Sequence, residues 1–594
     1  MNKLSSTTIF YFILFLSLFI SCFSFGQKPK KTPDDPNLKK IDIKSSDKIE
    51  QAPNLYNGNL VLSGKVKLFH RGATLLADTV ILDQVKNMFF ARSNVRLNVG
   101  DTVHLTSRKL DYDGNALLAT AYENVVLKDR SQTIETDKLY YDRKSNTAYY
   151  NTRSKITRGT NIMFSNAGTY DLTTRSTHFQ NDVNLDTKDQ FIKSDDLTFY
   201  NAEGKAVFKG PSTITDKKNT KNYIYTEDGE YFTRTKEAFL HKNSRIYNDG
   251  KILSGEELYF NQKTGFGRGT GNVKIDDPKE NRYLIADYGE VYQQKDSAFV
   301  RGRAYMVKAF KKDSLYISAE LLTIARDKAK KSTLRGYKKA RFYKSDIQGK
   351  CDSLVFRETI RQMHFYRKPI FWTGIRQITG DTIYAYLNTK SEKMDSIKVF
   401  QNAFAISKVD SLTLTDYQQI KGRHILGTFE NEEFNYVRVD GNAQSLVYVD
   451  DEDKKKKTKD RIGINRSDCG IIEADFVNKK VNIIGCRINA QAELYPESKL
   501  PQNQRYLKDF VWLSKERLNK WQDIFVDIPE GNPDDFRPSI SNIGNSSKPK
   551  SEIKKEKKAK TDSKNSTNST RTKSDTTRGN VIKSKGGLTS GQER

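Results

Sequence analysis

The 594-residue chain is poor in several residue types that build particular kinds of protein. Four cysteines are too few for a scaffold held together by disulfides or for a metal site with several cysteine ligands. Six scattered histidines leave little room for a histidine-rich zinc cluster. After residue 23, no apolar run approaches the ~20 residues of a membrane-spanning helix. These shortages direct attention to the charge and to the aromatic residues.

The charge is strongly positive, with 101 Lys and Arg against 73 Asp and Glu, for a net charge of +28. Such a balance is compatible with nucleic acid, anionic lipid or acidic glycan as a partner. Residues 536–594 hold 15 basic and five acidic residues and almost no large apolar ones, which predicts a disordered basic tail. More than a third of the excess charge therefore lies outside the expected fold.

The N-terminus has the pattern of an export signal. Lys3 precedes an apolar run from Ile9 to Phe23, and Gly26-Gln27 offers a cleavage site with small residues before it. We therefore expect a signal peptide over residues 1–26 and a linker over 27–53. Lipidation at Cys22 and a retained membrane anchor remain open alternatives. Export argues against nucleic acid as the partner.

The rest of the chain is a repeat array. One short phrase recurs every 29–33 residues between positions 80 and 383. It consists of an acidic residue, then Leu or in its place Val, Ile or Gly, and two positions later an aromatic or aliphatic residue. A second phrase, typically Asn-Val-x-Leu, follows each first one by about 14 residues. Periods of 20–50 residues are typical of stacked arrays. Clear copies of the first phrase are Asp137-Lys-Leu-Tyr-Tyr-Asp142, Asp195-Asp-Leu-Thr-Phe-Tyr200 and Glu256-Glu-Leu-Tyr-Phe-Asn261.

Each repeat reads as β-structure. Apolar residues alternate with period 2, and Asp-Gly-Asn or Ser-Asn clusters separate the runs. The sequence predicts an all-β fold, an elongated β-jellyroll or β-solenoid, whose alternate residues form one inner apolar ladder. The recurring acidic residues are best explained by turn capping rather than by calcium binding. The inner ladder comprises Val80, Leu82, Leu110, Tyr112, Leu139, Tyr141, Leu197, Phe199, Leu258 and Phe260.

The array is expected over residues 54–390 and in degenerate form, with insertions, over 391–490. The charged block 450–460 is expected to be a loop in that second part. Helical spacing of Tyr506, Phe510 and Trp521 predicts a helical cap over 491–535. Cys469 and Cys486 flank a short strand–turn–strand, so they are candidates for a disulfide, whereas Cys351 has no evident partner.

Motifs of catalysis are missing from the sequence. It contains no G-x-S-x-G, H-E-x-x-H or phosphate-binding loop, and the histidines occupy unlike positions in the repeats. Gly265–Gly271 is glycine-rich but reads as a hairpin turn without a following helix. We expect neither an enzyme nor a cofactor or metal site.

The tandem phrases behind an export signal resemble the OstA/LptA-like family, which includes the N-terminal domain of LptD-like translocons. Thr136–Asp142 and Gly269–Ile275 are the best matches, and the resemblance covers residues 55–390 well and 391–490 weakly. It implies an open β-jellyroll that binds lipopolysaccharide acyl chains inside, so that the ten ladder residues would be the lipid-binding positions. It also implies a periplasmic location, possible association with the outer membrane, and edge-strand pairing with inner-membrane LptC-like and outer-membrane LptD-like proteins. The chain is much longer than one LptA-like module and lacks the strands of a large membrane barrel.

Two functions follow from this reading. The first is a periplasmic bridge that carries lipopolysaccharide toward the outer membrane along an apolar trough. The second is a non-enzymatic exported scaffold or adhesion protein in which the same ladder is the dry core of a closed β-solenoid. The two differ in whether the inner ladder is open or sealed.

Overall fold

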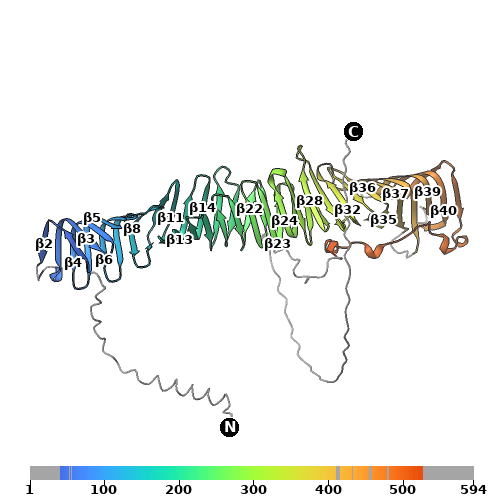
Figure 1. Ribbon diagram of the computed structural model, residues 1–594. Coiled ribbons are helices and arrows are strands. Elements are labelled where there is room, and N and C mark those ends of the chain that lie inside the picture. Colours follow the sequence, from blue (N-terminus) through green and yellow to red (C-terminus); the bar gives the residue numbers. More distant parts are fainter. Residues whose placement is uncertain are drawn as a thin grey trace, which may run out of the picture. The chain divides into compact units, whose positions relative to one another are not determined.

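The computed structural model describes residues 40–51, 54, 56–409, 415–430, 433–453, 458–477 and 480–525, all within one compact unit that spans Met1–Pro529. Side chains of residues 451–460 and 478–481 are not described. The expected signal peptide, the alternative anchor at Cys22 and the basic tail lie outside the described residues. Within them, 42 antiparallel strands form one continuous sheet, which confirms the all-β prediction (Figure 1).

The sheet is folded into two facing layers, which we call layers A and B. Long strands cross both layers and bend between them, while pairs of shorter strands occupy one layer each. The crossing strands are β3 (Leu60–His70), β4 (Ala73–Asp83), β5 (Met88–Val99), β6 (Val103–Asp113), β7 (Leu118–Lys128), β8 (Thr133–Asp142), β13 (Ser176–Asp186), β14 (Gln190–Tyr200), β23 (Phe266–Asp277), β24 (Arg282–Tyr292), β37 (Met394–Lys408), β38 (Tyr417–Glu430), β39 (Glu433–Asp453) and β40 (Thr458–Val477).

The shorter strands complete each layer in chain order. Layer A also contains β2 (Lys48–Gln51), β9 (Thr147–Tyr150), β12 (Ala167–Asp171), β15 (Lys205–Phe208), β18 (Gly229–Phe232), β19 (Glu237–Leu240), β22 (Glu257–Asn261), β25 (Ser297–Arg301), β28 (Leu321–Arg326), β29 (Ser332–Tyr337), β32 (Ser353–Arg357), β33 (Gln362–Tyr366), β36 (Thr382–Leu387) and β41 (Lys480–Arg487). Layer B also contains β1 (Asp42–Ser45), β10 (Ser154–Arg158), β11 (Asn161–Ser165), β16 (Ser212–Asp216), β17 (Tyr223–Thr226), β20 (Arg245–Asn248), β21 (Lys251–Ser254), β26 (Tyr305–Ala309), β27 (Ser314–Ser318), β30 (Ala340–Tyr343), β31 (Ile347–Cys351), β34 (Ile370–Thr373), β35 (Arg376–Thr379) and β42 (Gln491–Tyr495). Short 3-10 helices η1 (Tyr56–Gly58), η2 (Pro278–Glu280), η3 (Gln293–Lys295) and η4 (Glu358–Ile360) lie in the connections.

The bend between the layers explains the recurring acidic residue of the repeat. In β5, Ser93 and Asn94 both take positive φ values, 61° and 50°, so the strand turns sharply there. The Asn94 side chain donates a hydrogen bond of 2.6 Å to Asp78, the first residue of a repeat phrase. Asn402 donates to Asp381 in the same way at 3.0 Å. Asparagine suits this position because its short polar side chain tolerates the left-handed conformation.

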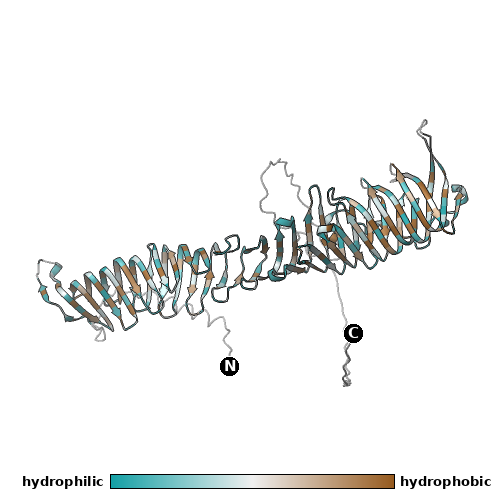
Figure 2. Cartoon of the chain, turned by 90° about the horizontal axis from the view of Figure 1, so that it is seen from above, coloured by the Kyte–Doolittle hydropathy of each residue, from teal (hydrophilic) through white to brown (hydrophobic). Residues whose placement is uncertain are grey.

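Alternate residues of every strand point between the layers and form one core. Figure 2 shows apolar and polar residues alternating along the strands. The core continues without interruption from Ile41 to Ile472. The layers pack closely at Gly269, where a Cβ would lie 3.1 Å from Val273 of the facing layer. Burial of such side chains contributes about 1.5–3 kcal/mol each, so the core is the main source of stability.

The array is longer at both ends than the sequence predicted. Residues 42–51, expected to be linker, form β1 and β2, which pair with β3. Asp47 and Ile49 occupy the places that Asp78 and Val80 take one repeat later, so the array begins with a degenerate copy of the phrase. The charged block 450–460, expected to be a loop, is instead partly the end of the β39–β40 hairpin, in which Asp450 lies opposite Arg461. Residues 454–457 lie outside the described residues.

The predicted helical cap over 491–535 is wrong as far as the structure describes it. Residues 491–495 form β42, and residues 496–525 form an extended segment, the C-terminal strap, that is orange in Figure 1. Its only regular structure consists of the 3-10 helices η5 (Glu497–Lys499), η6 (Gln502–Gln504), η7 (Ser514–Glu516) and η8 (Trp521–Phe525). Pro496 and Pro501 interrupt helical hydrogen bonding, and the outer face of layer B supplies other partners for the backbone.

The C-terminal strap runs back along the outer face of layer B instead of capping its end. Leu507 packs with Phe404 and Tyr417, whereas Ile524 packs with Tyr305, far earlier in the array. Buried glutamines of layer B hold the strap's backbone. Gln377 donates to the Val511 carbonyl and accepts from the Leu513 amide, both at 2.7 Å, and Gln419 makes equivalent bonds to Arg505 and Leu507.

Replacing Gln377 by alanine should release the middle of the strap. The change leaves a partly buried carbonyl and a partly buried amide without partners, at a cost of about 1–3 kcal/mol. Tryptic cleavage at Lys515 should accelerate at least about fivefold, because local opening becomes easier by that free energy. The control is Gln180→Ala, at an exposed position on β13. Equal cleavage rates for the two variants would show that the glutamine does not hold the strap.

Candidate functional site: the interior between the layers and its seam

All ten predicted ladder residues lie on the inner face of layer A. None is more than 6% exposed, and Val80, Leu110, Leu139 and Leu197 are fully buried. Cross-strand neighbours keep them in register; Phe89, for example, stacks on Tyr112 with ring centroids 4.9 Å apart. The ladder predicted from the sequence is therefore a continuous apolar surface, and the facing layer covers it.

The sides of the two layers opposite the bends meet in a line of polar contacts, which we call the seam. In the N-terminal part of the seam, His70 of layer B contacts the Tyr112 hydroxyl at 2.9 Å. Arg143 of layer A donates to the same hydroxyl at 2.6 Å and to the Arg71 carbonyl at 2.7 Å. Burial raises the pKa of Tyr112, so its hydroxyl stays protonated at neutral pH. The inner aromatic ladder thus reaches the seam through this tyrosine.

Further along the chain, side-chain amides and hydroxyls close the seam. Gln132 of layer B donates to Thr177 of layer A at 3.2 Å, and both side chains are buried. Gln190 of layer B donates to the Tyr231 hydroxyl. Charged groups lie beside them: Asp129 of layer B accepts from the Tyr170 hydroxyl, and Asp189 of layer B pairs with Lys236 of layer A at 2.7 Å. The neutral hydrogen bonds each contribute only about 0.5–1.5 kcal/mol, and the partly exposed Asp189–Lys236 pair adds at most about 1 kcal/mol.

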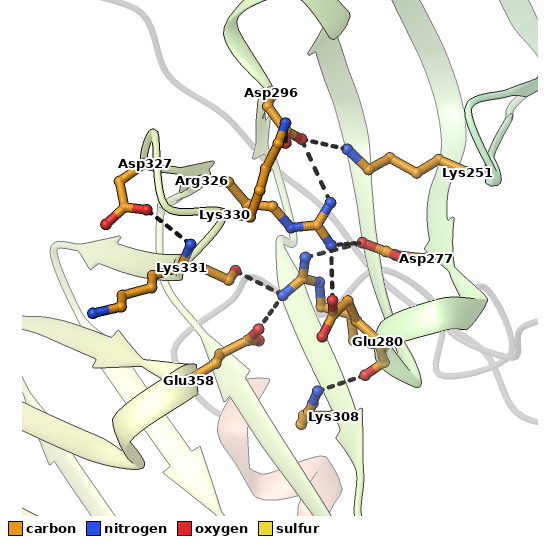
Figure 3. Close-up of polar contacts among 12 residues, drawn as sticks. Lys251, Asp277, Glu280, Asp296, Lys308, Arg326, Asp327, Lys330, Lys331 and Glu358 are labelled. Atoms are coloured by element: carbon orange, nitrogen blue, oxygen red, sulfur yellow. Dashed lines mark hydrogen bonds and ion pairs between the residues drawn. The ribbon is translucent and has the colours of Figure 1, made fainter.

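A buried charged cluster closes the middle of the seam (Figure 3). Arg282 of layer B, 3% exposed at its side chain, pairs with Asp277 at 2.9 Å and with Glu358 of layer A. Arg326 of layer A reaches Asp277 at 3.0 Å and Glu280 at 3.1 Å across the seam. Removing one partner of such a buried pair is costly because it leaves an uncompensated charge. This cluster is the strongest lateral closure among the contacts described here.

The seam was not predicted from the sequence. Its residues stand at strand ends and in the turns between them, where polar residues are common and solvent-exposed, so nothing in their spacing separates them from ordinary loop residues. Only their burial reveals the role; Gln190, for example, is 3% exposed. The one available signal is that tyrosines recur near the strand ends that border the seam, as at Tyr112, Tyr170 and Tyr231.

The interior is exposed at the two ends of the array. At the N-terminal end, Ile49 lies opposite the fully buried Leu62 and is 55% exposed. At the C-terminal end, Ile484 lies opposite the buried Ala474 and is 42% exposed. Cys469 and Cys486 form a disulfide between β40 and β41, with Cα atoms 5.8 Å apart. Inward-facing apolar side chains are thus covered along the array and uncovered at its ends.

One small cavity interrupts the packing beside the ladder. It measures about 30 Å³ and is lined by Leu253, Phe260, Gly267, Ile275 and Val291, among others. Within the described ranges, no cluster of three or more His, Cys, Asp or Glu side chains is arranged to hold a metal ion. The chemistry that the interior offers is therefore contact with apolar groups.

Comparison with known proteins identifies the N-terminal part of the array. A family model described as OstA-like protein matches residues 38–195, which therefore belong to the OstA-like family and confirm the resemblance predicted from the repeats. The match includes six of the ten ladder residues. The same two-layer architecture continues beyond it to β42.

A second comparison concerns a small part of the chain. Penicillin-binding protein 1A of Rickettsia bellii (strain RML369-C) is 33% identical over 113 residues, which is 16% of this chain and 14% of that protein. Because so little of that protein is covered, its name carries no argument about this one. No helix within the described ranges has the length and apolar character needed to cross a bilayer.

Glu358→Ala should destabilise the protein more than removal of an exposed ion pair. The change leaves Arg282 without its buried carboxylate from layer A and should lower the free energy of unfolding by about 3–5 kcal/mol. Glu320→Ala, which removes a partner of Lys339 on the surface, should cost less than about 1 kcal/mol. Urea unfolding of both variants measures the difference. Similar small losses would show that the cluster does not hold the layers together.

Proposed function

We propose that this protein is a periplasmic lipid-binding bridge, which carries lipopolysaccharide toward the outer membrane between its two layers. The observation that carries the proposal is the continuous inner apolar ladder, uncovered at both ends of the array. The match to the OstA-like family supports a role related to lipopolysaccharide or lipid transport, and that family is one of binding and transport proteins rather than of known enzymes.

Transport through this interior requires the layers to separate. The ladder residues are packed against the facing layer, so an acyl chain has to replace those contacts with its own. Apolar contacts are non-directional, so the exchange costs little if the chain fills the same volume. The polar head group stays in water, and the seam is the side through which it projects. The buried charged cluster around Arg282 should resist the separation of the layers most strongly.

The burial of the ladder between the two layers favours a second candidate function. With every ladder residue at most 6% exposed, the array has the dry core of an exported scaffold or adhesion protein. The two functions differ in one measurable respect, because only a carrier brings lipid into contact with the inner ladder in the cell.

Photo-crosslinking tests the lipid contact directly. A benzophenone amino acid at Phe199 or Phe260, and in a third variant at Leu139, should capture lipopolysaccharide in living cells. The matched controls are Thr198, Tyr259 and Tyr140, which precede or follow these residues and point outward, so they should capture several-fold less. Capture by outward positions alone, or normal lipopolysaccharide display after depletion of the protein, would favour the scaffold.

The partners are proposed to bind at the ends of the array. The last strands, β41 and β42, each pair with β40 on one side. Exposed apolar residues cluster there, including Ile483 at 61% and Leu494 at 53%. An unpaired strand edge is a template for strand addition. We propose inner-membrane LptC-like and outer-membrane LptD-like proteins as the partners that add strands to the two edges.

A crosslinker at Ile483 should capture an outer- or inner-membrane partner protein. The control position is Val85, which is 97% exposed but lies in a lateral turn between β4 and β5. Mass spectrometry of the captured species identifies the partner. Equal capture at both positions, or none at Ile483, would contradict edge-strand pairing.

A further inference from the structure

A line of aromatic rings crosses the outer face of layer A, whereas the C-terminal strap packs on layer B. Consecutive rings have centroids 5.1–6.5 Å apart and belong to six successive strands of the layer, from β18 to β25. Each ring is at least partly exposed, and Phe239 is 39% exposed. We call this line the aromatic stripe; it comprises Phe232, Phe239, Tyr259, Phe266, Tyr292 and Phe299.

Each of the six strands also carries a polar residue beside its ring, two positions away on the same face. In strand order these polar residues are Glu230, Glu237, Asn261, Arg268, Glu290 and Ser297. The strand register keeps rings and polar residues within two neighbouring rows; Phe239 lies directly opposite Tyr259, and Phe266 directly opposite Tyr292. The surface therefore presents one ring and one hydrogen-bonding group per strand, at a spacing of ~4.8 Å.

The charges of the stripe balance. Three carboxylates stand among the rings, and in the described contacts three cations lie against the rings or the carboxylates. The carboxylates are Glu230, Glu237 and Glu290, and the cations are Lys205, Arg268 and Lys295. The stripe thus has no excess charge to attract a polyanion, although the chain as a whole carries +28.

We propose that the aromatic stripe binds an extended, uncharged polysaccharide of 1,4-linked sugar rings, with one sugar over each strand. One face of such a sugar ring carries C–H groups, which stack on the negative face of an aromatic ring. Its hydroxyl groups both donate and accept hydrogen bonds, so they suit the mixture of carboxylates, guanidinium and amide beside the rings.

The repeat of the stripe favours a polysaccharide over a partner protein. An extended 1,4-linked chain advances by about one strand spacing per sugar, so successive sugars meet successive rings. Cross-strand pairing stabilises single aromatic pairs, but it does not require an unbroken line over six strands. The stripe lies on the outside of layer A, and it is therefore independent of the lipid proposed for the interior.

The first test measures how binding depends on the length of the sugar chain. The full-length protein should bind chitohexaose, an uncharged 1,4-linked hexamer, at least about tenfold more tightly than chitobiose, because each further sugar adds a ring contact. Calorimetric titration measures both affinities. Cellohexaose, which lacks the acetamido groups, is titrated in parallel, and binding of either hexamer supports the proposal. Equal affinity for dimer and hexamer would contradict it.

The second test removes two of the six rings. Phe239→Thr with Phe266→Thr keeps residues suited to strands and should weaken binding of chitohexaose at least about tenfold. The matched control is Tyr223→Thr with Tyr247→Thr, which removes a stacked pair from the outer face of layer B, where the ring centroids are 4.1 Å apart. This control should bind as the unaltered protein does.

The third test adds a ring. Thr323 of β28 lies directly opposite Phe299 on the outer face of layer A. Thr323→Tyr should therefore tighten binding of chitoheptaose by a few-fold, a gain that misfolding cannot produce. No saturable binding of either hexamer, capture of a partner protein by the stripe in place of the sugars, or an equal loss in the layer B control would overturn the proposal.

Discussion

The bend in the middle of the strands is the constraint on which the rest of the structure depends. Without it, the alternating strands would form a single sheet with one apolar face in water. The left-handed pair at residues 93–94, held by Asp78, turns that face onto itself. Each bend thus lets two halves of the same strand bury each other, and the repetition of the bend makes the core continuous.

Once the layers face each other, their free sides must be closed. The array does this with polar side chains from strand ends and from the turns between them. Amide hydrogen bonds and a partly exposed ion pair hold the seam around Gln190, and the buried charges of Arg282 and Glu358 hold its middle.

The C-terminal strap shows how the outer surface is used. It occupies the face of layer B over β26 to β40 and leaves the edge of β41 uncovered. The end of the array therefore stays available for strand addition, although the chain continues beyond it. The strap also brings Glu516 to Lys350 of β31.

The sequence alone determined the repeat, the strands and the ladder. Period-2 alternation and an acidic residue every 29–33 positions are local properties, so Leu139 and Phe199 could be assigned to an inner face without any structure. Tertiary structure decided what covers that face. The seam joins residues far apart in the chain, such as Arg282 and Glu358. Their pairing does not produce a repeating pattern in the sequence. The strap was misread as helical because its apolar spacing matched a helix, whereas the glutamines of layer B, distant in sequence, provided better partners for its backbone.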